Sequence, residues 1–298
     1  MTDDDLITGA AAPSAERIIR SPIALDAVWV ACVSALLIVS SVLPLVDLEE
    51  VYLRTADAPL RVYTVWLPVV AVVTAVLGVV RRSSVLGAVA TGLLVPSVAL
   101  AGSVAAALFF DAASPFTDVG VPVTLAAAAI GLIMLLRWFV YQPTPIVGVD
   151  LRPNRVSAVV LVALGVALAA NVAVSAVSDD DPWSLPFAMS TALMMLTAAV
   201  VVAAGFVRSD EANVLAATAC AAQLLAVIVV RVVEPSDSGV GLAESATTLR
   251  TGAVGLVLLA AAAGVAIFGA AVSRLDPAVA DGPDATDDAA WRWSADDA

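Results

Sequence analysis

Two amide side chains are the residues of this sequence best suited to bind a solute inside a membrane. Asn171 and Gln223 each lie within a long apolar stretch, where a polar side chain is uncommon. Neutral amides can line the path of a neutral or weakly polar solute, but they also form hydrogen bonds between neighbouring helices. Both roles remain open, and a solute path through Asn171 and Gln223 is the functional prediction that they support.

The sequence lacks the residue types on which most catalytic sites depend. It contains no His, and all 14 of its basic residues are Arg. The absence of His excludes imidazole acid–base catalysis, Ser–His nucleophiles and imidazole-bound metals, and the absence of Lys excludes a complete phosphate-binding loop of the G-x-x-x-x-G-K type. We therefore expect no catalytic residue, no cofactor and no metal site. The protein is predicted not to be an enzyme; an enzyme acting on lipids or lipid-linked sugars is the last alternative, because no paired carboxylates are recognisable.

An aromatic pair near the C-terminus could bind a partner. Trp291, Arg292 and Trp293 lie in an acidic segment of low apolar content. Such a segment is typical of disordered chain, and an aromatic pair within it could dock a cytoplasmic protein. Partner docking and a purely solvated tail are both kept as interpretations.

Composition indicates that these residues are carried by membrane-spanning helices. Hydrophobic residues make up 61% of the 298 positions and charged residues 14%, with a mean hydropathy of +1.00. The apolar residues come in blocks of about twenty, the length that a helix needs to cross a bilayer. The fold class predicted is therefore all-α, a polytopic transmembrane helical bundle of about eight helices. The expected spans are 27–46, 63–80, 84–110, 119–138, 156–178, 186–207, 213–233 and 251–272.

The spans divide into two sets of four, which could form two four-helix halves. Residues 85–90 (VLGAVA) are similar to residues 214–219 (VLAATA), 129 positions later, which would fit a parallel internal repeat of the kind found in some transporters. Abundant Ala and Val can also produce such a match, so biased composition is the alternative. The domain prediction that follows is a cytoplasmic segment 1–26, a first half 27–140, a connecting loop 141–155, a second half 156–272 and an acidic disordered tail 273–298.

Arg placement predicts the orientation. Ten of the 14 Arg fall on the cytoplasmic side if the N-terminus is cytoplasmic, as the positive-inside rule requires. We expect a multi-pass protein of the cell membrane with both termini in the cytoplasm. Tyr63 and Trp66 then belong to an aromatic belt at the outer interface. Pro96 should kink the long third span, with a re-entrant break as the alternative.

Small and sulfur-containing residues indicate close helix packing. Gly165 with Ala169, and Ala262 with Ala266 and Ala270, recur at helical spacing and would let helices approach one another. Cys32 and Cys220 lie in separate apolar blocks and are predicted to be small buried hydrophobes.

The acidic excess restricts the partners. The formal net charge is −13, which argues against nucleic acid, because phosphate binding needs clustered basic residues. The Asp-rich, Lys-free, Ala- and Val-rich composition resembles that of multi-pass membrane proteins of salt-accumulating haloarchaea. This resemblance implies a halophilic habitat, names no family and transfers no functional residue.

Two functions follow as hypotheses. The first is a non-enzymatic membrane subunit or scaffold, because the loops are short and the acidic tail is the largest aqueous segment. The alternative is a permease or transporter for a neutral or weakly polar solute, because of Asn171, Gln223 and the two halves. The expected partners are membrane lipids and either a membrane-protein partner or further copies of the chain.

Overall fold

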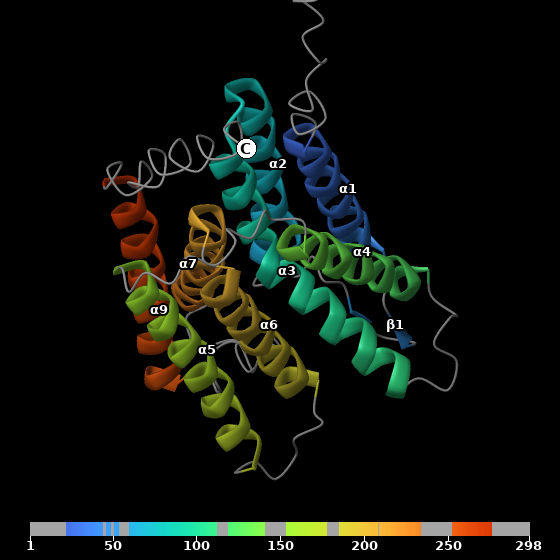
Figure 1. Cartoon of the computed structure of the whole chain (residues 1–298). Coiled ribbons are helices and arrows are strands. Elements are labelled where there is room, and N and C mark those ends of the chain that lie inside the picture. The colour runs from blue at the N-terminus through green and yellow to red at the C-terminus, as the bar shows by residue number, and fades with distance from the viewer. Residues whose placement is uncertain are drawn as a thin grey trace, which may run out of the picture.

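The computed structural model of the chain is a bundle of helices, as the hydropathy pattern predicted (Figure 1). It describes residues 22–43, 46–48, 51–53, 60–111, 119–140, 153–177, 185–207, 209–233 and 252–275. Eight of its helices are long and apolar enough to cross a membrane, which confirms the multi-pass helical class. The α-helices are α1 (Pro22–Val42), α2 (Leu67–Arg81), α3 (Ser84–Asp111), α4 (Gly120–Val140), α5 (Pro153–Val177), α6 (Leu185–Val207), α7 (Asp210–Val233) and α9 (Gly252–Leu275).

The first helix is displaced from its predicted position. The sequence predicted a span at 27–46, whereas α1 ends at Val42. Pro22 begins the helix, since proline suits a first helical position. Pro44 disfavours helix in the residue before it and lacks an amide donor, which accounts for the early end. Val46 therefore leaves the span and joins a short strand.

That strand belongs to a hairpin between α1 and α2 that was not expected in an all-α protein. The strands β1 (Val46–Leu48) and β2 (Val51–Leu53) pair antiparallel. Alternating polar and apolar residues on β1 suit an element of period two. The hairpin is small and leaves the helical fold class unchanged.

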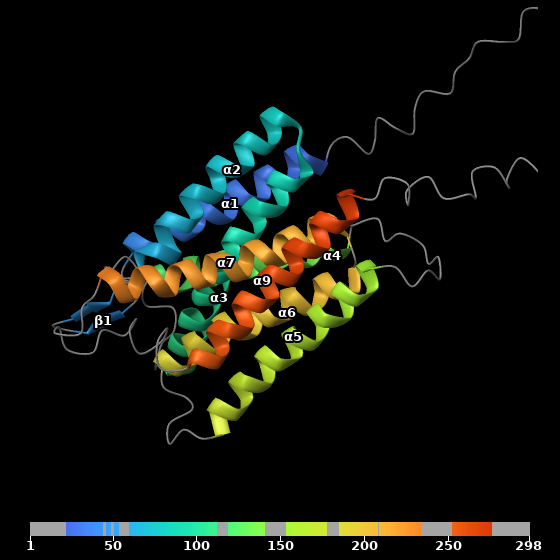
Figure 2. The same cartoon turned by 90° about the vertical axis from the view of Figure 1, so that its left-hand side faces the viewer.

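The eight helices form two rings of four, which are adjacent in both views (Figures 1 and 2). In the first ring, α1 packs on α2, α2 on α3, α3 on α4, and α4 returns to α1. In the second ring α5, α6, α7 and α9 follow one another in the same way, and α9 returns to α5. The two rings meet chiefly where α3 packs against α6 and α7. The structure thus has the two four-helix halves that the sequence suggested.

Helices α3 and α7 run parallel and in register at the seam between the halves. At their first turns, the Ser84 hydroxyl donates to Glu211 Oε1 at 3.1 Å. About two turns further along α3, Gly92 lies so close to α7 that an added Cβ would be 2.7 Å from the Leu215 carbonyl oxygen and 2.8 Å from Thr218 Cβ. Ser84 and Glu211 are 127 positions apart, close to the 129 of the sequence match. A pseudo-twofold axis along the membrane normal would place equivalent residues of α3 and α7 side by side in this way.

The two rings close at equivalent positions. In the first ring Arg137 Nη1 lies 2.7 Å from Asp26 Oδ1, so that the eighteenth residue of α4 binds the fifth of α1. In the second ring Gly269, the eighteenth residue of α9, lies against Ser157, the fifth of α5. An up-and-down ring of four helices brings the end of its fourth helix to the start of its first with or without duplication, so the internal repeat stays a prediction from the sequence match.

Close contacts at glycines hold the second ring together. An added Cβ on Gly165 would lie 2.5 Å from Val202 Cγ2, and one on Gly205 would lie 2.7 Å from Val162 Cγ2. The contact is therefore reciprocal between α5 and α6, and the predicted role of Gly165 is confirmed. Ala262, Ala266 and Ala270 are also buried.

Burial identifies the centre of the bundle. In α3 67% of the apolar window is buried and in α7 61%, against 28–50% in the other spans, so these two helices form the core. Helix α3 continues unbroken through Pro96, which rules out the re-entrant alternative.

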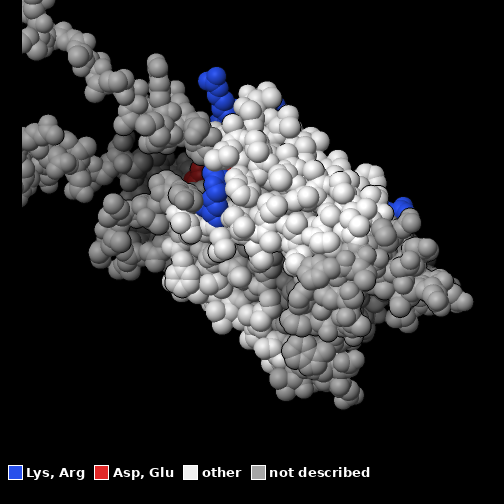
Figure 3. Space-filling model, turned by 90° about the vertical axis from the view of Figure 1, so that its right-hand side faces the viewer, with Lys and Arg blue, Asp and Glu red and all other residues white. Residues whose placement is uncertain are grey.

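Figure 3 shows basic side chains at two ends of one face and an uncharged surface between them, as a bilayer requires.

Candidate functional site

The predicted site residues occupy different parts of the fold. Gln223 is buried in α7, with 1% of its surface exposed. Asn171 is half-buried on α5, the helix diagonally opposite α7 in the second ring. The structure therefore does not bring the two amides together, and the role of each stays a prediction. Trp291, Arg292 and Trp293 lie outside the described residues. The acidic tail was predicted to begin at residue 273, but α9 continues to Leu275.

Gln223 has a neighbour that the sequence did not reveal. The Tyr63 side chain is fully buried and interacts with the Gln223 side chain. Tyr63 belongs to the first half and Gln223 to the second, so the pair bridges the seam. Yet neither Tyr63 Oη nor Gln223 Oε1 has a hydrogen-bond partner of good geometry among the described residues. Both oxygens are thus buried with unused hydrogen-bonding capacity, on two side chains that interact.

A wide helical turn places Tyr63 inside. Residues Val62–Trp66 form a π-helix, η2, immediately before α2, and η2 packs on α3 and α7. Pro68 accounts for the turn, because it has no amide hydrogen to donate to Thr64 and its ring would crowd that carbonyl. The Leu67 amide instead donates to the Val62 carbonyl, five residues back. Single π-helical turns within α-helices occur frequently at functional sites.

The interpretation of Tyr63 as an interfacial aromatic residue was wrong. Its neighbour Trp66 is 63% exposed, as the aromatic belt predicts, but Tyr63 has no exposed surface. Hydropathy cannot distinguish these residues, since both begin the same apolar span. The signal in the sequence was Pro68, five positions after Tyr63, which indicates that the helix cannot continue regularly toward its N-terminus.

Three further buried hydroxyls lack partners in the described part of the chain: Ser34, Ser97 and Thr191. Most other hydroxyls in the spans donate to the carbonyl three or four residues back, as Thr197 does to Leu193 at 2.8 Å. Each orphaned buried polar group costs about 1–3 kcal/mol. These orphaned hydroxyls make the interior of the bundle more polar than helix packing requires.

The charges of the described residues lie at helix ends. The acidic and basic side chains that the structure describes are Asp26, Arg61, Arg81, Arg82, Arg137, Asp210 and Glu211. Asp26 is the fifth residue of α1 and pairs with Arg137 near the end of α4. No group of three or more potential metal ligands occurs among the residues described. The Tyr63–Gln223 pair therefore offers neutral hydrogen bonding rather than charge or metal chemistry.

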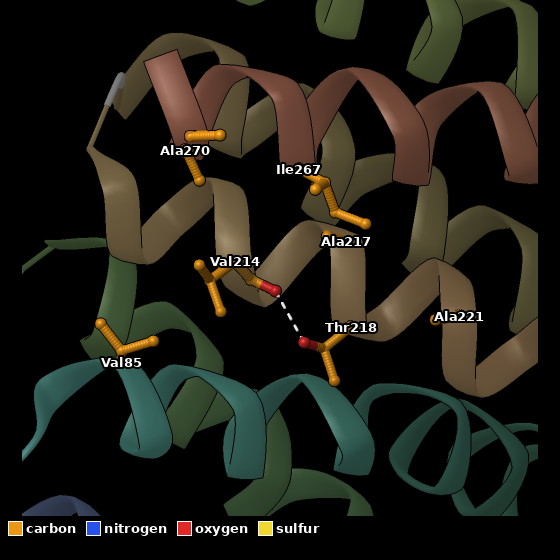
Figure 4. Close-up of a pocket in the computed structure, with 8 residues that line it drawn as sticks. Val85, Val214, Ala217, Thr218, Ala221, Ile267 and Ala270 are labelled. Carbon is orange, nitrogen blue, oxygen red and sulfur yellow. Dashed lines mark hydrogen bonds between the residues drawn. The ribbon is translucent and has the colours of Figure 1, made fainter. Parts of the chain in front are cut away.

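A second feature is an apolar groove of ≈ 590 Å³ between α3, α7 and α9 (Figure 4). The Thr218 hydroxyl, its one polar side-chain group, donates to the Val214 carbonyl at 2.8 Å. The groove is therefore apolar throughout. It is lined by Val85, Val214, Ala217, Thr218, Ala221, Ile267, Ala270 and Ala271.

Of the two cysteines, Cys220 is buried as predicted, whereas Cys32 is exposed on α1.

No protein-family model, curated protein or solved structure matches the chain.

Proposed function

We propose that this protein is a permease that binds a small neutral, hydrogen-bonding solute between its two four-helix halves, at Tyr63 and Gln223. The observation that carries the proposal is the pair of buried, unpartnered oxygens, Tyr63 Oη and Gln223 Oε1, at the seam. A phenol can donate and accept a hydrogen bond, and an amide oxygen accepts one. A solute with hydroxyl or amide groups would satisfy both.

The location of the pair supports this proposal. In transporters built from repeats, the substrate site lies at the interface between the repeats. Gln223 lies six residues before Val229, the end of its span, or roughly 9 Å inside the apolar region at 1.5 Å per residue. A hydrogen-bonding site at this depth is useful only to a molecule that enters the membrane interior.

The absence of described charge at the pair favours a neutral solute. An ion would need compensating charges or several oxygen ligands, which this part of the seam does not offer among its described side chains. The proposal thus takes up the transporter alternative from the sequence, with Tyr63 added. Asn171 is not required for it.

Transport by purified protein in proteoliposomes tests the proposal. Stopped-flow light scattering would follow the entry of glycerol and of urea after an osmotic step. We expect wild-type vesicles to admit at least one of these solutes faster than protein-free vesicles. Tyr63→Phe and Gln223→Leu should each reduce the added rate at least several-fold, because each removes one of the two oxygens.

Asn171→Leu is the matched control, since it makes the same amide-to-leucine change on α5. It should leave transport unchanged, and loss of transport in this variant alone would move the path to α5.

Stability provides a second measurement. Replacement of an orphaned polar group by an apolar one should leave the unfolding midpoint unchanged or raise it, so reduced transport together with retained stability separates solute binding from structural damage. Wild-type rates equal to those of empty vesicles for both solutes would contradict the proposal.

A subunit or scaffold role, the other function expected from the sequence, depends on Trp291, Arg292 and Trp293. Gentle detergent extraction followed by mass spectrometry would detect a stoichiometric partner, and deletion of residues 275–298 should then release it. The cell-membrane location, the cytoplasmic termini and the halophilic habitat likewise remain predictions from Arg placement and composition.

A further inference from the structure

Ser97 of α3 carries a buried hydroxyl that does not bond to its own helix. The side chain has no exposed surface, and its Oγ has no hydrogen-bond partner among the described residues. Serine and threonine within a helix commonly donate to a carbonyl one turn back, as Ser103 of the same helix does to Leu100 at 2.8 Å. The Ser97 hydroxyl is therefore free to bind another group.

Ser97 lies at the same depth in the bundle as Gln223. Helices α3 and α7 run parallel and in register, since Gly92, the ninth residue of α3, meets Thr218, the ninth of α7. Ser97 is the fourteenth residue of α3 and Gln223 the fourteenth of α7. Both side chains thus lie roughly 20 Å along their helices at 1.5 Å per residue.

One apolar cluster connects Ser97 with the proposed solute site. The buried members of the cluster include Tyr63 of η2, Leu100 of α3 and Ala226 of α7. Leu100 follows Ser97 by three residues and Ala226 follows Gln223 by three, and residues at this spacing share a helix face. Three unpartnered oxygens, on Tyr63, Ser97 and Gln223, therefore belong to side chains on the faces that form this cluster.

We propose that Ser97 is a third solute-binding residue beside Tyr63 and Gln223, and that the solute is a small polyol. This role rests on the proposed transport function. Two protein hydroxyls and one amide oxygen can each pair with a hydroxyl of the solute, because a hydroxyl both donates and accepts. The apolar cluster suits the carbon skeleton. Three protein oxygens thus fit a molecule with three hydroxyls, such as glycerol.

Solute selectivity in proteoliposomes tests the role of Ser97. The probes are glycerol and two diols with the same number of carbons, propylene glycol and trimethylene glycol, and the measured quantity is the rate of entry above that of protein-free vesicles. Wild type should admit glycerol roughly fivefold faster than either diol or more, because a diol leaves one buried oxygen unpaired. Ser97→Ala should admit glycerol several-fold more slowly and lose the preference for glycerol over at least one diol, because that oxygen is gone.

The matched control is Ser34→Ala, which removes another fully buried hydroxyl without a described partner. Ser34 belongs to α1, which packs within the first half on α2, α3, α4 and η2, so this variant should keep the selectivity of wild type. Size-exclusion elution confirms that each variant is folded.

The outcomes separate the role of Ser97 from transport itself. An unchanged glycerol preference in Ser97→Ala, or its loss in both serine variants, would overturn the role of Ser97. Entry of urea without entry of glycerol would overturn the polyol assignment. These results would leave the proposed transport function standing, whereas wild-type rates equal to those of empty vesicles for both glycerol and urea would contradict transport and this role together.

Discussion

Among the glycines of α3, Gly92 is the one that lies against α7. Any Cβ at this position would overlap the Leu215 carbonyl oxygen and Thr218 Cβ, at 2.7 and 2.8 Å. Backbone cannot move aside as a flexible side chain can. Gly92 is therefore the residue on which the contact between the two halves depends most directly.

Gly92→Ala should destabilise the protein by about 1–3 kcal/mol, the usual cost of inserting a group into a packed interior. Gly87→Ala is the control on the same helix, because an added Cβ there meets nothing within 4 Å. It should be neutral or stabilising by up to about 1 kcal/mol, since alanine favours helix over glycine. Thermal unfolding in detergent would measure both changes. Equal midpoints for the two variants would contradict the close approach of α3 and α7.

At the scale of elements, the π-helical turn η2 determines which side chain faces the seam. Its extra residue changes the rotation of the preceding residues by about 100° relative to a continuous α-helix. The cause is local: Pro68 has no amide hydrogen to donate to the Thr64 carbonyl. A substitution that restores the backbone amide hydrogen at position 68 should therefore change the environment of Tyr63, five residues earlier in the chain.

Pro68→Ala should let α2 continue as regular α-helix and turn Tyr63 out of the seam. Nitration of tyrosine by tetranitromethane, followed by peptide mass spectrometry, would measure this exposure. Tyr63 should be protected in wild type and react several-fold faster in Pro68→Ala. Val69→Ala, an exposed neighbour, should leave the protection unchanged. Protection of Tyr63 in both variants would show that other contacts, and not Pro68, hold it inside.

At the scale of the whole molecule, each half closes its own ring, and the halves meet through α3, α6 and α7. The Arg137–Asp26 ion pair closes the first ring and the Gly269–Ser157 contact closes the second. The chain passes between the halves only once, from α4 to α5. Two halves with their own closures should be able to fold as separate chains.

Co-expression of residues 1–147 and 148–298 as separate chains should therefore yield a complex that purifies through a tag on either fragment. The cut lies between α4 and α5, outside both helices. Gly92→Leu in the first fragment should reduce recovery of the second, because the bulk separates α3 from α7. Independent elution of unaltered fragments would contradict the division into two halves.

The sequence by itself determined the helical class and the positions of the spans, with the largest error in α1. Backbone groups in hydrocarbon must be satisfied within each segment, so length and hydropathy suffice to predict a span. Gly165 was predictable for a similar reason, since small residues mark close helix contacts.

Only the tertiary structure decided which polar groups share a site. Tyr63 and Gln223 are 160 positions apart, and their meeting depends on the packing of η2 against α7. Hydropathy carries no information about that packing, because every helix in the bundle is apolar on nearly all sides. The separation of Asn171 from Gln223 was decided in the same way, by the order of helices around the second ring.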